Sequence, residues 1–122
     1  MRDYREFAEL LGKTLTDVTL GHDTVRFDVA GGTAYLLEHQ QDCCEYVYVE
    51  SVVGDLADLI GEPITRAEEV SHSDNPPHGA ATESHTWTFY KLDTRKGGVT
   101  IRFLGESNGY YSESVDFVKV QA

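Results

Sequence analysis

Apolar and polar residues alternate along most of this chain, in short segments that turn-forming residues separate. In one of them Val25, Phe27 and Val29 share one side of the backbone, and Arg26 and Asp28 share the other. A period of two is the pattern of a β-strand with one face buried and one face in solvent. Seven strands are predicted on this basis, near residues 14–20, 24–29, 33–39, 46–53, 86–92, 99–104 and 114–120. The turns between neighbouring strands are short, so the sheet is predicted to be predominantly antiparallel.

Two stretches have helical spacing instead. Residues 3–11 place apolar side chains three and four positions apart and end before Gly12, and residues 55–60 start at a possible capping residue, Asp55, and end before Gly61. With 122 residues the chain is long enough for one core. The predicted fold is therefore α+β: a predominantly antiparallel sheet with two short helices, in a single compact domain that spans residues 1–122.

Three further expectations concern how these segments are placed. Residues 46–53 are β-branched or aromatic almost throughout, which predicts a central strand buried on both faces. The Asn-Gly pair within residues 106–113 predicts the turn of a hairpin. A further strand is expected over residues 64–70, and the polar, Pro- and Gly-containing residues 71–79 are expected to form the longest loop.

The only two cysteines, Cys43 and Cys44, are adjacent. Neighbouring Cα atoms are about 3.8 Å apart, whereas a disulfide usually joins Cα atoms about 5.5 Å apart, so we expect reduced thiols. Side chains of neighbours in a strand point to opposite faces, which places one thiol in the core and the other beneath a loop. His39, Asp42 and Glu45 surround the pair with residue types that bind zinc, but the cysteine spacing does not match the usual Cys-x2-4-Cys. No metal and no cofactor are predicted.

The chain is strongly acidic, with 21 Asp and Glu against 10 Lys and Arg and a formal net charge of -11. No Lys or Arg occurs between Arg26 and Arg66, where eight acidic residues fall. Such a field repels phosphate backbones and attracts basic proteins, so general nucleic-acid binding is not expected. No apolar run reaches the roughly 20 residues that span a bilayer, and the first residues lack a signal-peptide pattern, so we expect a cytoplasmic protein.

Two segments combine charges with aromatic or amide side chains that a core does not require: the acidic loop 38–45 and the turn 106–113. Solvent-facing turns tolerate such residues, and Tyr-rich loops make good contact surfaces. The candidate binding residues are Asp42, Glu45, Glu50, Glu106, Asn108, Tyr110, Tyr111 and Glu113. No catalytic residue is assigned, because Ser107 lies in a predicted hairpin rather than in the strand-to-helix turn of a nucleophile elbow.

Several motifs together resemble those of a family of uncharacterised phage and prophage proteins, a domain of unknown function. They include Gln-Asp-Cys-Cys-Glu at residues 41–45, Gly-Asp-Leu-Ala-Asp-Leu-Ile-Gly at 54–61, Thr-Trp-Thr-Phe-Tyr at 86–90 and Gly-Glu-Ser-Asn-Gly-Tyr-Tyr-Ser at 105–112. The resemblance covers nearly the whole chain. It implies a small protein made in a bacterial host, and it brings no assigned activity or ligand.

Charge and resemblance together favour a small acidic accessory protein that binds a host protein without catalysis, as an inhibitor of host defence would. The alternative is a sponge that sequesters a nucleotide-type signalling ligand through Trp87, Arg95, Arg102, Asn108 and the two tyrosines at positions 110 and 111. An enzyme of unknown class ranks third, so the sequence favours a protein that is not an enzyme. The oligomeric state is left open.

Overall fold

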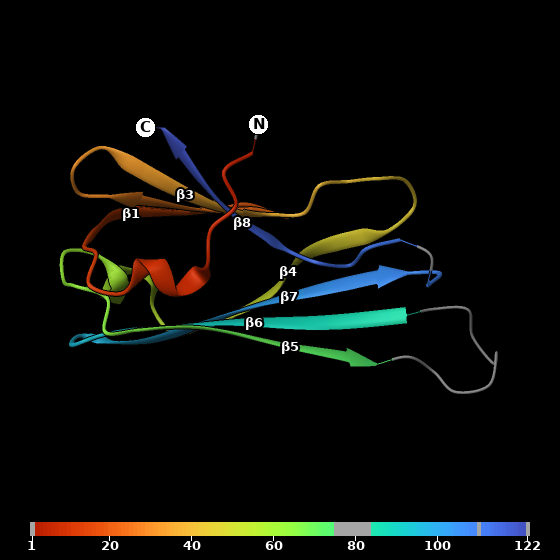
Figure 1. Ribbon diagram of the computed structural model, residues 1–122. Helices are drawn as coiled ribbons and strands as arrows, with labels where there is room; N and C mark the ends of the chain where they lie inside the picture. The colour runs from red at the N-terminus through yellow and green to blue at the C-terminus, as the bar shows by residue number, and fades with distance from the viewer. Residues whose placement is uncertain (1, 75–83, 110, 122) are drawn as a thin grey trace.

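The computed structural model describes residues 2–74, 84–109 and 111–121. Within them, two four-stranded antiparallel sheets lie face to face (Figure 1). The first sheet has the order β1-β2-β3-β8, with β1 at Leu15–Leu20, β2 at Val25–Val29, β3 at Thr33–Glu38 and β8 at Asp116–Gln121. The second has the order β4-β7-β6-β5, with β4 at Tyr46–Val53, β7 at Gly97–Ser107, β6 at Ser84–Thr94 and β5 at Arg66–Asp74.

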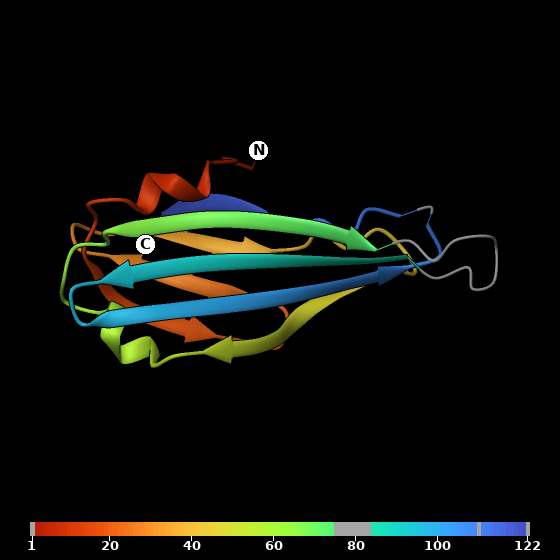
Figure 2. The same cartoon turned by 90° about the horizontal axis from the view of Figure 1, so that it is seen from below.

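The predicted strands and their antiparallel pairing are confirmed, and they form one compact domain. In β2 the apolar Val25, Phe27 and Val29 are buried and the residues between them are half-buried, as the alternation predicts. The inward-facing side chains of both sheets form one core, which includes Phe27, Tyr35 and Phe117 from the first sheet and Tyr90, Ile101 and Phe103 from the second. The strands of the second sheet are long and run side by side in Figure 2.

The two predicted α-helices are wrong. Each is a single four-residue 3-10 turn, η1 at Phe7–Leu10 and η2 at Leu56–Leu59. Segments this short form too few hydrogen bonds to sustain an α-helix, and both end where the chain must join the sheets. The architecture is thus two packed β-sheets rather than α+β. Among the described residues, no helix has the length and apolar character needed to cross a membrane.

Strand β4 is an edge strand, not a central one. Val47 is buried, whereas Tyr46 is 48% exposed, so only one face of the strand packs on the core. The aromatic and β-branched composition of β4 indicated a strand correctly but did not show how many neighbours it has. An edge position leaves the start of the strand open to solvent.

The segment 108–115 is a connection between the two sheets rather than the turn of a hairpin. Strand β7 is already paired on both sides, with β4 and β6, so the chain crosses to the first sheet, where β8 pairs with β3. Residues 71–74, assigned to a loop from the sequence, continue β5. The rest of that loop, residues 75–79, lies outside the described residues.

Candidate functional site

Two polar segments meet at one end of the pair of sheets. They are the turn 39–45, which leads from β3 to β4, and the connection 108–115, which leads from β7 to β8 (Figure 1, right). His39 Nδ1 lies 2.7 Å from the Ser114 carbonyl oxygen and so joins the two segments directly. The structure therefore brings together the two regions that the sequence singled out. We call this region the acidic end, defined by residues 38–45, 106–109 and 111–116.

The carboxylate of Glu45 organises the turn. Its side chain has no solvent exposure, and it accepts hydrogen bonds from the backbone N–H groups of Cys43 at 2.8 Å and Asp42 at 2.9 Å. His39 Nε2 approaches it at 2.6 Å, and Gln41 donates to the Glu45 carbonyl at 2.6 Å. Four donors surround this buried carboxylate, since Gln41 Nε2 also lies 3.3 Å from it, and they fix the backbone path of the turn.

These contacts also set the charge of Glu45. Burial by itself opposes ionisation, but the hydrogen bonds from Cys43, His39 and Asp42 outweigh it and lower the pKa of Glu45 to about 2. Both ring nitrogens of His39 lie within hydrogen-bond distance of oxygen atoms, one in the Ser114 carbonyl and the other in the Glu45 carboxylate. The buried Glu45 carboxylate and the His39 ring therefore form a closed pair.

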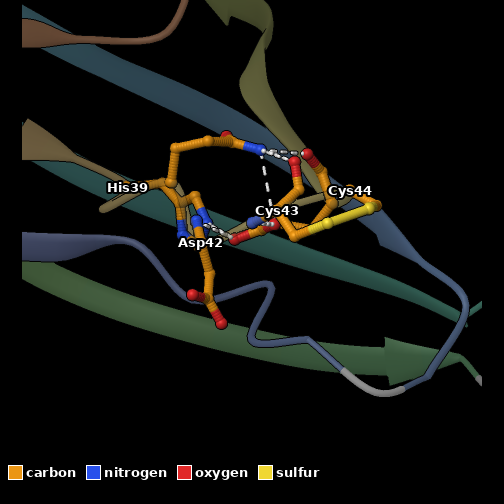
Figure 3. Close-up of a disulfide and its surroundings, with 6 residues drawn as sticks. His39, Asp42, Cys43 and Cys44 are labelled. Atoms are coloured by element: carbon orange, nitrogen blue, oxygen red, sulfur yellow. Dashed lines mark hydrogen bonds and ion pairs between the residues drawn. A yellow bond between two sulfur atoms is a disulfide. The ribbon is translucent and has the colours of Figure 1, made fainter.

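Cys43 and Cys44 form a disulfide with each other, so the expectation of reduced thiols is wrong. Both residues are exposed, and neither lies in the core. The expectation failed because it treated the pair as part of a strand, whereas β4 begins only at Tyr46 and residues 43 and 44 lie in a bend. In the bend the two side chains can lie on the same side, at a Cα separation of 3.7 Å (Figure 3).

A pocket of about 290 Å³ lies beside the disulfide turn. Its lining is His39, Gln40, Gln41, Asp42, Ser112, Ser114 and Asp116. Figure 3 shows the Asp42 side chain directed away from the disulfide. Asp42 is exposed, and within the described residues it has no ion-pair partner. The pocket therefore combines carboxylates, hydroxyls and amides.

A second buried carboxylate, Glu113, holds the connection 108–115 in place. It is 8% exposed and accepts hydrogen bonds from the hydroxyls of Thr86 at 2.8 Å, Ser84 at 3.3 Å and Ser107. Gly105 permits this approach, because a Cβ on it would lie 2.7 Å from the Glu113 carbonyl oxygen. Like Glu45, Glu113 is directed inward and shapes a loop.

The remaining predicted residues are spread over the acidic end and the outer face of the second sheet. Glu50 is ion-paired with Arg102 at 2.6 Å, and Glu106 lies 3.5 Å from His85. Asn108 is exposed and Tyr111 is half-buried. Tyr110 lies outside the described residues. Of the predicted residues that the structure describes, only Asp42 lines the pocket.

The described residues suggested for a nucleotide ligand do not all meet in one place. Arg102 stacks over Trp87, 4.8 Å from the ring centroid, on the outer face of the second sheet. Arg95 is in the turn between β6 and β7, at the other end of the sheet, where it pairs with Glu62 at 2.8 Å. The sequence grouped Arg95 with Arg102 because positive residues are concentrated at 91–102, but Arg95 lies in the turn before β7 and Arg102 lies midway along that strand.

Sequence reasoning missed the contacts of His39. It grouped His39 with Asp42, the cysteines and Glu45 as possible zinc ligands, whereas the structure uses Glu45 to bind the ring and the backbone of the turn. Within the described ranges, no three His, Cys, Asp or Glu side chains are arranged to hold a metal ion. The acidic residues and the histidine in this segment correctly indicated a polar cluster. That His39 pairs with Glu45 depends on the conformation of the turn.

A family model described as a domain of unknown function (DUF7448) matches residues 8–117. The chain belongs to this family. The match includes β1 to β7, the disulfide turn and the connection 108–115, so the acidic end lies within the DUF7448 domain. Comparison with curated proteins and with solved structures gives no match.

Proposed function

We infer that this DUF7448 protein acts by binding, without catalysis, and that it captures a basic host protein through the acidic end. The proposal also includes a phage or prophage origin, a place in the bacterial cytoplasm and a role against host defence. The resemblance of the motifs to phage proteins supports that biological setting. The chemistry of the pocket supports the choice of partner.

The pocket beside Asp42 is the observation that carries the proposal. Its wall holds the carboxylates of Asp42 and Asp116, and carboxylates form the strongest hydrogen bonds with Lys and Arg side chains. About 290 Å³ is enough space for one such side chain with its hydration. The net charge of -11 adds a long-range attraction that would steer a basic surface toward this end.

The hydrogen bonding of the site supports binding over acid-base chemistry. A general base needs a lone pair or proton that it can exchange with a substrate. Both nitrogens of His39 are already engaged, and the carboxylates of Glu45 and Glu113 are buried under donors. These three groups hold the loops, and the pocket retains the carboxylates of Asp42 and Asp116, the second of which also lies 3.8 Å from the Arg2 guanidinium.

The test is capture from host lysate, with mass spectrometry of the retained proteins, at rising salt. Asp42→Asn with Asp116→Asn should abolish capture of the basic partner, and capture by wild type should weaken as salt screens the charges. A matched control removes the same two units of charge elsewhere, by Asp17→Asn with Glu68→Gln, because both residues are exposed and lie on β1 and β5, outside the acidic end. The control should retain capture. Equal capture by the two double variants would contradict the proposal.

The sponge alternative draws support from one contact, the Arg102 guanidinium over Trp87, since a nucleobase can stack in the same way. Small molecules released from the captured protein test it. A bound nucleotide that is lost in Trp87→Ala and retained at high salt would favour the alternative over the basic partner.

A further inference from the structure

The Cys43–Cys44 disulfide is exposed and directly follows Asp42, which lines the pocket (Figure 3). Thiol-disulfide exchange needs access of an attacking thiolate to one sulfur, and exposure provides it. A disulfide between neighbours joins no separate elements of the fold. Its contribution to stability through loop closure is therefore small, because that contribution grows with the number of residues enclosed. A purely structural role explains this bond poorly.

We propose that Cys43–Cys44 is a reversible redox site, reduced by a dithiol, and that its state sets the shape of the turn 39–45. In the oxidised form the covalent ring keeps both side chains on one side of the bend. Without the bond, neighbouring side chains can return to opposite sides of an extended chain.

The contacts of Glu45 transmit this change. The N–H of Cys43 and the N–H of Asp42 both donate to its carboxylate, and Gln41 Nε2 lies 3.1 Å from the Cys43 carbonyl oxygen. An extension of the bend would remove these groups from Glu45. Asp42 would move with them, so the wall of the pocket would change. That consequence for partner capture rests on the proposed function.

The reaction balances with a dithiol as reductant. One of its thiolates attacks a sulfur of the pair, which forms a mixed disulfide and releases the other cysteine as a thiolate that takes up a proton. The second thiol of the reductant then attacks its own sulfur in the mixed disulfide and releases the remaining cysteine, which is also protonated. Two electrons and two protons reach the protein, and the reductant becomes a disulfide.

The surrounding charge selects the class of reductant. Asp42 precedes the disulfide, its carboxylate has no ion-pair partner in the part of the chain that the structure describes, and the whole chain is acidic. An anionic thiol such as glutathione is repelled, whereas a neutral dithiol is not. We expect dithiothreitol to react faster than glutathione at low salt, and the ratio of the two rates to fall as salt rises. In a cytoplasmic protein, disulfides are most often transient or redox-sensing, which agrees with this role.

The experiment uses the full chain, purified without reductant. Iodoacetamide should label no cysteine before treatment and both after dithiothreitol, by intact mass, with the protein still folded. Backbone amide resonances of residues 39–45 and 112–116 should shift on reduction and return on reoxidation, while those of the distant strands stay in place. The double variant Cys43→Ser with Cys44→Ser should give amide resonances like those of the reduced form, and dithiothreitol should not change them.

Three results would overturn the proposal: labelling of both thiols from the start with no disulfide formed by a mild oxidant, reduction only after unfolding in urea, or reduction with no shift of the turn amides. Partner capture is measured separately in both redox states. Loss of capture in both states would contradict the proposed function and leave the resonance shifts to decide the redox site. Capture that differs between the states would support both.

Discussion

At the scale of single residues, Glu45 is the acidic side chain whose role differs most from what its sequence context suggests. It lies in the most acidic part of the chain, where a charge is expected to face solvent. Instead it is buried, paired with His39 and bonded to two backbone N–H groups. The charge thus defines a loop, and the neighbouring Asp42 is the carboxylate that remains on the surface.

This role predicts a pH dependence of stability. A carboxylate whose folded pKa is lowered contributes stability that is present above its unfolded value, near 4.5, and is lost as the pH falls through the folded value of about 2. Glu45→Gln should lower the unfolding midpoint at pH 7, because an amide nitrogen would face the donors that now meet an anion. The difference from wild type should shrink between pH 4.5 and pH 2.

Urea or thermal unfolding at several pH values between 7 and 2 measures the effect. Asp42→Asn is the control, since this exposed carboxylate has no ion-pair partner among the described residues and its removal should leave the pH profile of wild type unchanged. An identical pH slope for Glu45→Gln and wild type would show that Glu45 does not hold the turn.

At the scale of elements, the junction between β4 and η2 depends on a close backbone approach. Gly54 has a φ of +106°, and a Cβ on it would lie 2.4 Å from the carbonyl oxygen of Gly98. The same φ sign occurs at Gly31, with φ +105°, in the turn between β2 and β3, where a Cβ would meet nothing within 4 Å. Substitutions at these two glycines therefore distinguish the free-energy cost of a left-handed backbone from that of a steric overlap.

Gly31→Ala should therefore destabilise the protein by about 1 to 2 kcal/mol, the cost of a left-handed conformation for a residue with a Cβ. Gly54→Ala should cost more, at least about 3 kcal/mol, because the backbone of β7 must also move. Denaturant unfolding of both variants measures the difference. Equal losses would mean that the junction adjusts without strain.

At the scale of the whole molecule, the short turn η1 connects the two sheets. Phe7 is 4% exposed, and its ring centroid lies 4.8 Å from that of Tyr90 in the second sheet and 5.2 Å from that of Phe117 in the first. It thus belongs to one core shared by both sheets. The sequence predicted a helix for this segment, and the segment packs in the core although it forms only a 3-10 turn.

Phe7→Ala should cost about 3 to 5 kcal/mol, as large truncations in a core do. Leu11→Ala, four residues further on and 49% exposed in wild type, should change stability by less than about 0.5 kcal/mol. Denaturant unfolding measures both variants, followed by one probe of secondary structure and one probe of tertiary packing. A small loss for Phe7→Ala would show that the turn does not contribute to the common core.

The sequence by itself determined the strands, because the alternation of side chains follows from the pleat of a strand and is a local property. Residues 25–29 and 99–103 carry that pattern, and both are strands. It also determined the acidic character and the two polar segments that meet at the acidic end. The length of each helical segment was misjudged, because the spacing of apolar residues does not show how many intrahelical hydrogen bonds the segment can form in the fold.

Only the tertiary structure decided which sheet each strand joins, and from that the rest of the site follows. Strand β8 pairs with β3 because β7 has no free edge, so residues 108–115 cross between the sheets and place Ser114 beside His39. The burial of Glu45 and the meeting of the two adjacent cysteines depend on that arrangement. Contacts between residues 75 positions apart leave no local pattern in a sequence, whereas the pleat of a strand does.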